Sequence, residues 1–368
     1  MGFPSSLWRY FLTDLAGSGI TDLSKITSDR FCEVILNGPL SIGGTVPSDN
    51  PQVWIPYADA YLDPYLDEGT RLLWGFRRES GAPPYYTIRA ATICQLVEDE
   101  AAQDDARTRF VGWDPWHYLL SRPVCNADGS LPGAAGLSFT ATQASVVIGT
   151  LLANTIVNYG HAYVDAGVAY IGTGFYTGTL ETAAGMIIDV NFAQGTSVGE
   201  AWQQVTDMGV CDIILDPIYD PLNRPNYLVQ LNVYEQAGVT RDEAIFAWNA
   251  PGRSLVGLSR QQDGSGRATS VKFFAGQGGV DGEAPVQTDV AAETKFGTYY
   301  AQQFFPAVSV VAAVTSLAEQ QLALRKNGKT TVTFRPAPER SPRPWQDYGL
   351  GDRVPVWAKP QGFRKLLG

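Results

Sequence analysis

The sequence has few charged residues and few of the side chains on which most enzyme sites are built. Only 17% of its 368 residues are charged, against about 25% in an average soluble domain. Its two histidines, His117 and His161, lie in no H-E-x-x-H or Cys/His cluster, so a histidine-based zinc site has no support. There is no G-x-S-x-G motif and no Walker A loop. These absences exclude an α/β-hydrolase nucleophile elbow and a P-loop.

Cysteine is also scarce, and its spacing matches no metal or redox motif. Cys32, Cys94, Cys125 and Cys211 lie far apart and form no C-x-x-C pair. We expect four buried thiols, with a disulfide or metal pair as the alternative.

Positive charge is the minority sign, which limits the classes of partner. The formal net charge is −10 and the sequence pI is about 4.8. Sequence-independent binding to DNA or RNA needs clustered lysine and arginine, so the sequence argues against a nonspecific nucleic-acid-binding protein. No uncharged apolar run approaches about 18 residues, so no membrane span is expected. Residues 1–15 carry polar and charged side chains throughout, which predicts synthesis in a cytosol without a signal peptide.

Hydrophobic residues are plentiful, at 45% of the chain, and the length allows two or more cores. So few charges on a chain of this length imply that much of the surface is neutral and polar, or is covered by partners. The second alternative fits a subunit of an assembly.

The stretch at residues 31–47 predicts the first hairpin of a β domain. A β-favouring run meets Asn37-Gly38, the strongest short-range signal for a tight turn with positive φ. Pro39 has no N–H to donate to a sheet, and a second apolar segment then runs into Gly43-Gly44.

The rest of the chain mixes strands with two long helices. Helical spacing of apolar residues predicts helices at 140–159 and 308–325, and Ser197 with Glu200 forms a capping-box pattern for a shorter helix ending near Met208. Residues 160–185 are expected to form a long surface loop, with an irregular hairpin as the alternative, and residues 280–298 are expected to be a loop. The turn Asp263-Gly264-Ser265-Gly266 predicts a hairpin between 253–261 and 268–275. The other expected strands are 7–12, 52–56, 69–79, 85–93, 108–113, 186–192, 211–216, 227–233, 329–334 and 351–357.

These patterns predict the α+β class, mainly β, with a small β-α-β-β unit and the two long helices. The expected divisions are a β domain at 1–125, a linker and helix with a Gly-rich loop at 126–185, the β-α-β-β unit at 186–238, a second β segment at 239–300, and a helix with strands at 301–368.

The remaining candidates for chemistry have simpler structural explanations. The acidic runs at 98–100 and 104–105 fit a solvated turn, because a glycosidase needs two carboxylates that converge from different elements. Asp189 would matter only beside a second carboxylate. The glycines at 172–178 miss the dinucleotide fingerprint by one residue. We therefore expect no catalytic residue, no metal ligand and no cofactor.

A family resemblance rests on several short motifs. The pattern Leu36-Asn37-Gly38-Pro39 within 31–47 resembles the N-terminal signature of minor tail proteins from phages of actinobacteria. The paired strands 73–78 and 85–90, and the aromatic run 113–119, resemble later parts of the same domain. The segment 348–354 is similar to baseplate-hub and tail-associated proteins of long-tailed phages.

The resemblance implies a homotrimeric hub at the phage tail tip. Each subunit would offer two tail-tube-like β-barrel or sandwich domains, so that three subunits mimic a six-fold ring and cap the tail tube. The implied partners are the distal tail protein, the tape measure protein and tip or fibre proteins, with phage DNA passing through the lumen without specific binding. The implied location is the virion, after assembly in the host cytoplasm. On this hypothesis Asn37, Gly38, Pro39, Gly43 and Gly44 shape an edge that meets a neighbouring subunit.

Two other functions stay open from the sequence. The first is the distal tail protein, a hexameric ring, although the two interior helices and the β-α-β-β unit argue against it. The second is a glycan hydrolase that uses a carboxylate pair including Asp189.

Overall fold

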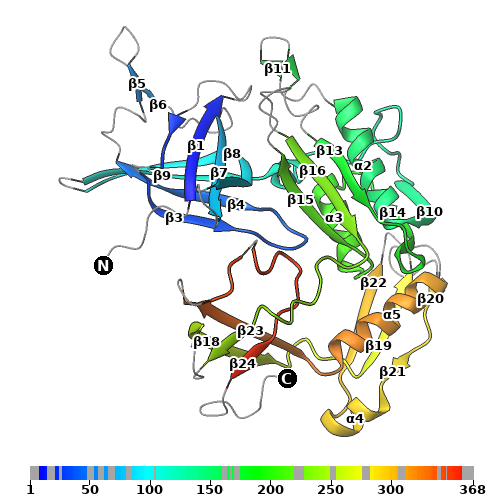
Figure 1. The fold of residues 1–368 in the computed structure, drawn as a ribbon. Coiled ribbons are helices and arrows are strands. Elements are labelled where there is room, and N and C mark those ends of the chain that lie inside the picture. Colours follow the sequence, from blue (N-terminus) through cyan, green and yellow to red (C-terminus); the bar gives the residue numbers. More distant parts are fainter. Residues whose placement is uncertain are drawn as a thin grey trace.

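Strands dominate the structure, and helices are few (Figure 1). The mainly β prediction is therefore confirmed. The computed structural model describes residues 8–14, 21–24, 27–47, 54–56, 62–64, 71–79, 85–102, 105–159, 164–165, 168–169, 175–218, 228–248, 254–275, 282–305, 311–337, 341–344 and 346–358.

The N-terminal part forms one antiparallel sheet of seven strands, in the order β2-β1-β7-β8-β9-β4-β3. Its two edges are not paired with each other, so the described strands form no closed barrel. A side chain links the edge strand β3 to β1, the strand next to the other edge, since the Tyr10 hydroxyl donates to the Phe31 carbonyl at 2.6 Å. The strands are β1 (Trp8–Asp14), β2 (Thr21–Asp22), β3 (Ser28–Glu33), β4 (Ser41–Pro47), β7 (Arg71–Glu79), β8 (Tyr85–Ala102) and β9 (Asp105–Trp113), with a separate pair β5 (Trp54–Pro56) and β6 (Leu62–Pro64).

The predicted first hairpin is present as β3 and β4, which pair antiparallel. Asn37 has the expected positive φ, at 59°. The connection is longer than a two-residue turn, because Glu33 and Ser41 are the last paired residues. The prediction of a tight turn at residues 37–38 was therefore wrong about the length of the connection, although it was correct about the backbone conformation of Asn37.

The middle part is built on a three-stranded sheet with the order β13-β16-β15. The predicted capping box is confirmed: Ser197 Oγ accepts from the Glu200 N–H at 3.2 Å, and the Glu200 carboxylate accepts from the Ser197 N–H at 2.9 Å. The elements are α1 (Pro115–Leu119), β10 (Leu137–Gln143), α2 (Ala144–Tyr159), β11 (Val164–Asp165), β12 (Val168–Ala169), β13 (Phe175–Leu180), the 3-10 turn η1 (Ala184–Met186), β14 (Ile187–Phe192), α3 (Val198–Asp207), β15 (Asp212–Ile218) and β16 (Leu228–Tyr234).

Two expectations for this part were wrong. The helix predicted from residue 140 begins at Ala144, because 137–143 pair with β14 as strand β10. The loop predicted at 160–185 contains β13, which pairs in parallel with β16. Gly178 lies at an irregularity in that pairing, where a Cβ would overlap the Gln230 and Asn232 side chains. The glycine that indicated a loop is thus a close-packing residue.

The C-terminal part contains a two-stranded ribbon of β18 (Leu255–Asp263) and β23 (Lys329–Pro336). The predicted hairpin between 253–261 and 268–275 is wrong, because β18 pairs with β23 instead of β19 (Ser270–Ala275). The turn itself forms, with the Ser265 N–H donating to Asp263 Oδ1 at 2.8 Å. Beyond it the chain leaves the ribbon. A second short pair joins β17 (Phe246–Trp248) to β24 (Val356–Ala358) in parallel.

Strand β19 is the central strand of another sheet. In the sequence this sheet lies between β18 and β23, the two strands of the ribbon. It pairs with β20 (Gly282–Glu283), β21 (Gln287–Thr288) and β22 (Tyr300–Phe305), and α5 (Val311–Arg325) lies against the sheet (Figure 1). The loop expected at 280–298 holds α4 (Val290–Phe296). The N-cap of this helix is Asp289, whose carboxylate accepts from the Ala292 N–H at 2.8 Å. This cap was not predicted from the sequence.

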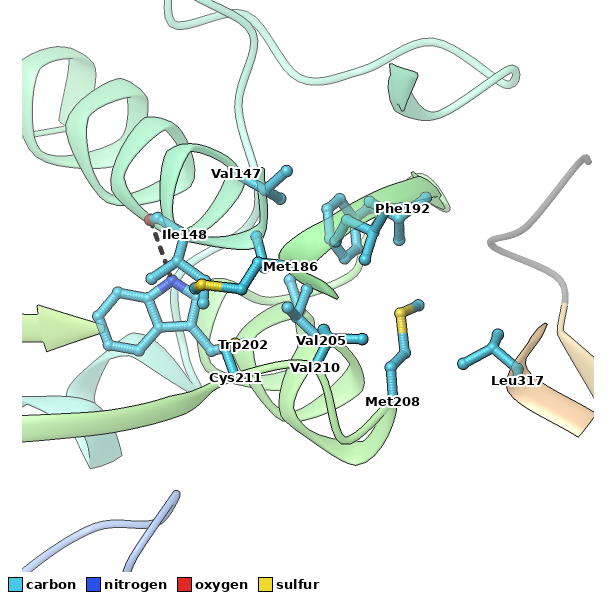
Figure 2. Close-up of a cluster of buried hydrophobic side chains, with 14 of the residues drawn as sticks. Val147, Ile148, Met186, Phe192, Trp202, Val205, Met208, Val210, Cys211 and Leu317 are labelled. Atoms are coloured by element: carbon cyan, nitrogen blue, oxygen red, sulfur yellow. Dashed lines mark hydrogen bonds between the residues drawn. The ribbon is translucent and has the colours of Figure 1, made fainter. Parts of the chain in front are cut away.

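The buried hydrophobic residues form two separate clusters. One belongs to the N-terminal sheet and includes Tyr10, Ile42 and Phe110. The other runs from the middle part into the sheet of β19 and α5, where Leu317 points toward Met208 (Figure 2). The domain boundaries predicted at residues 125, 185, 238 and 300 stay predictions.

Candidate assembly surface

Asn37 joins the N-terminal sheet to the middle part. Its side-chain amide donates to Asp212 Oδ1 at 2.7 Å, and its Oδ1 accepts from the Ile213 N–H at 2.7 Å. The second oxygen of Asp212 accepts from the Ala237 N–H at 2.8 Å. The left-handed backbone of Asn37 turns the amide toward β15, and asparagine tolerates that conformation better than most residues. We call this set of contacts the Asn37–Asp212 junction.

We expect Asn37→Gly to lower the free energy of unfolding by about 2 kcal/mol, because the Ile213 N–H and one Asp212 oxygen lose their partner. Glycine keeps the positive φ, so the loss reports the two hydrogen bonds. Asn37→Ala should lose about 1 kcal/mol more, from backbone strain. Urea unfolding of the three proteins measures both effects. Equal stability of the wild type and Asn37→Gly would show that the junction contributes nothing.

The other residues of the predicted interface lie in or beside the same hairpin. Gly38 and Pro39 are half-buried in the connection. Gly43 and Gly44 are buried in β4, between β3 and β9. A Cβ on Gly43 would lie 2.7 Å from the Phe31 ring and would overlap the main chain of β9. These glycines therefore allow close packing within the chain, and a subunit contact at this stretch stays a prediction.

Sequence reasoning did not find the partner of Asn37. Asp212 lies 175 residues away, and it looks like an ordinary polar residue at the start of a strand. No local spacing signals such a contact. Only the three-dimensional arrangement of β3, β4 and β15 reveals it.

Within the described residues, His117 belongs to no catalytic arrangement. His117 stacks on Trp113 with ring centroids 5.0 Å apart, and partial burial lowers the pKa of its imidazole. His161 lies outside the described residues. Within the described ranges, no three His, Cys, Asp or Glu side chains come together as a metal site.

Asp189 has a structural contact that accounts for its position. Its Oδ1 accepts from the Ala141 N–H at 2.9 Å, at the bulge of β10 where Ala141 has a φ of 46°. The carboxylate thus supports an irregular strand pairing, so no second carboxylate is needed to explain it.

All four cysteines are thiols, as expected, and Cys94, Cys125 and Cys211 are buried as predicted. The prediction of burial was wrong for Cys32, which is half-buried. Burial raises the pKa of the Cys211 thiol to about 12, with the neighbouring Asp212 charge adding to the effect. A thiol that stays protonated is a poor nucleophile and a poor metal ligand.

The buried carboxyl group of Asp114 makes the stability of the protein depend on pH. Burial raises its pKa to about 7, although the backbone N–H groups of Trp116 and His117 act in the opposite direction. The folded protein therefore holds a proton that the unfolded chain releases above about pH 4. Because the folded state binds this proton more tightly, the contribution of Asp114 to stability is greatest below about pH 4 and falls as the pH rises toward 7.

For the wild type we expect the free energy of unfolding to drop by about 2 kcal/mol more between pH 5 and pH 7 than for Asp114→Asn. Asparagine keeps an oxygen for the Trp116 N–H, which donates to Asp114 at 3.1 Å, but it cannot ionise. Urea unfolding at the two pH values tests this. Parallel pH profiles would contradict a raised pKa.

Large hydrophobic side chains remain exposed on several elements. Trp357 of β24 is 65% exposed, and Val290 of α4 is 70% exposed. Tyr300 and Phe304 of β22 are each about half exposed. Scattered apolar residues are normal on a surface, whereas neighbouring ones suggest contact with a partner. No helix in the described part of the chain is long and apolar enough to cross a membrane.

Comparison with solved structures shows which proteins have a similar fold. No family model matches the chain, and no curated protein does. The tail protein from Neisseria meningitidis MC58 superposes with a TM-score of 0.56 at 15% identity, over 97% of this chain and 89% of that one. The 43 kDa tail protein of prophage MuSo2 from Shewanella oneidensis gives 0.56 at 11% identity, over 97% and 91%.

A third structure agrees with these two. Prophage tail protein gp18 from Listeria monocytogenes EGD-e superposes with a TM-score of 0.52 at 14% identity, over 96% of this chain and 86% of that one. At such identities the likeness concerns the fold, and it extends over nearly the whole chain. The fold of this chain is therefore similar to that of phage tail proteins.

Proposed function

We propose that the chain is a structural subunit of a bacteriophage tail tip, a non-enzymatic hub that caps the tail tube. The observation that carries the proposal is the whole-chain similarity to three tail proteins, with 96–97% of this chain covered in each case. A similarity confined to one sheet would support only a shared module.

In this proposal three subunits form a ring that connects the distal tail protein and the tape measure protein to tip or fibre proteins. The ring opens so that DNA passes through its lumen. The net charge of −10 supports passage without binding, because an acidic wall repels phosphate. The hairpin of β3 and β4 contributes to subunit contact through its outer side, where Ile35 is 47% exposed.

The number of subunits tests the proposal against its main alternative. Multi-angle light scattering of the purified protein, and reconstruction of the tail tip, should give three copies per ring. Six copies would favour the hexameric distal tail protein. A wall-glycan release assay addresses the enzyme alternative, and release that is lost in Asp189→Asn would overturn the non-enzymatic role.

A further inference from the structure

Strand β22 presents an unpaired edge. It pairs in parallel with β19 over all six residues, from Tyr300 opposite Ser270 to Phe305 opposite Ala275, without a register shift. Within the described strands, β19 is its one partner. The N–H and C=O groups on the other side of β22 therefore have no strand to pair with in the described part of the chain. Such groups are a template for an added strand.

Other long edges of this protein carry features that discourage pairing. Natural edge strands use bulges, charges and proline for this purpose. Strands β3, β10 and β13 have irregular registers. Pro217 lies in β15, Asp189 lies in β14, and Arg260 and Arg335 lie in the ribbon of β18 and β23. In contrast, β22 reads Tyr-Ala-Gln-Gln-Phe-Phe, with no charge, no proline and no bulge.

The sheet face beside this edge is apolar and has no net charge. Phe304 stacks on Phe274 of β19 with ring centroids 4.7 Å apart. The Lys272 ammonium group lies 5.4 Å from the centroid of the Phe274 ring, and it forms an ion pair with the Glu283 carboxylate at 2.8 Å. Because that lysine and glutamate satisfy each other, the face offers no unpaired charge to a charged segment. Tyr300 extends the aromatic surface along the strand and is half exposed.

We infer that β22 receives an extended, uncharged strand from a different tail protein, with apolar side chains over Phe304 and Tyr300. This rests on the proposed function. The contact is β-augmentation: main-chain hydrogen bonds give affinity, and alternate side chains give specificity.

A second copy of this chain is the weaker candidate for two reasons. A ring of identical copies joins two different surfaces, and the other long edges carry features that discourage pairing. Two β22 strands could pair with each other, but six residues span only about 20 Å. That contact alone falls short of the roughly 1,200 Å² that a stable interface buries. A tail protein already held by other contacts needs only this small addition.

Hydrogen exchange of residues 300–305 tests the inference in the intact protein. The amides are followed by mass spectrometry in the isolated chain and in purified tails that contain it. In parallel strands about half of the amides point away from β19. We expect these outward amides to exchange at least tenfold more slowly in tails than in the isolated chain.

A matched pair of variants separates strand addition from general burial. Gln302 is exposed and lies opposite Lys272, which forms an ion pair with Glu283, so we expect both variants to fold like the wild type. Gln302→Lys adds an edge charge and should reduce incorporation into tails at least tenfold, whereas Gln302→Thr should incorporate like the wild type. Equal thermal unfolding of both variants in isolation confirms that folding is unaffected.

The outcomes distinguish the two proposals. If the chain is present in tails but its outward β22 amides exchange as in isolation, the inference is overturned and the hub proposal stands. If the chain is absent from tails, both are overturned. If the isolated protein dimerises on sedimentation and Gln302→Lys abolishes the dimer, a second copy occupies the edge and the inference is wrong.

Discussion

Replacing Trp202 with alanine is expected to lower the free energy of unfolding by about 3–5 kcal/mol. Trp202 is fully buried on α3, and its Nε1–H donates to the Ile148 carbonyl at 3.3 Å (Figure 2). Its ring meets Trp116 edge-on, with centroids 5.2 Å apart. The substitution removes a large apolar surface, leaves a cavity and removes the hydrogen bond from the indole to the Ile148 carbonyl. Urea unfolding followed by far-ultraviolet circular dichroism measures the loss.

Two further variants serve as references for the size of this loss of stability. Trp202→Phe keeps an aromatic ring and should lose less than half as much. Trp357→Ala removes the same side chain from a position that is 65% exposed, and should change stability by no more than about 0.5 kcal/mol. A loss below 1 kcal/mol for Trp202→Ala would mean that the larger hydrophobic cluster is not organised around this residue.

The second large effect is expected from a single methyl group. Gly43→Ala should destabilise the protein by about 3 kcal/mol, at the upper end of the cost of overpacking. Its Cβ would lie 2.7 Å from the Phe31 ring and would overlap the Phe110 carbonyl oxygen. The ring can rotate, but the carbonyl belongs to the main chain of β9, so two paired strands must separate. Thermal and urea unfolding should both reveal the loss.

Gly133→Ala is the matched control. No atom lies within 4 Å of the position that its Cβ would take. We expect no loss, or a gain of up to about 1 kcal/mol, because alanine restricts the unfolded chain more than glycine does. If both alanine variants behave alike, the approach of β4 to β9 is less tight than the structure indicates.

Sequence reasoning worked best where the signal is local. The spacing of Ser197 and Glu200 fixes one helix start, because the capping box is made by residues three apart. The positive φ of Asn37 was likewise predicted from its own residue type and that of its neighbour. In both cases the chemistry lies within a few residues.

It failed where the partner lies far away in the chain. The turn at 263–266 has the composition of a hairpin and does form a turn, yet β18 pairs with β23. A turn fixes the direction of the chain but does not decide which strand lies beside it. The Asn37–Asp212 junction and the parallel pairing of β13 with β16 were missed for the same reason. Pairing between distant segments is decided by the packing of the whole sheet.

The register of the ribbon has an implication for how this architecture can change. Asp263 at the end of β18 lies opposite Lys329 at the start of β23. The whole segment between these two residues is therefore an insertion that starts and ends at one residue pair of the ribbon. We call this segment the branch. A branch of this kind can grow, shrink or be replaced while both strands keep their alignment. The fold can diversify here, provided that the new branch still packs into the hydrophobic cluster that contains both Met208 and Leu317.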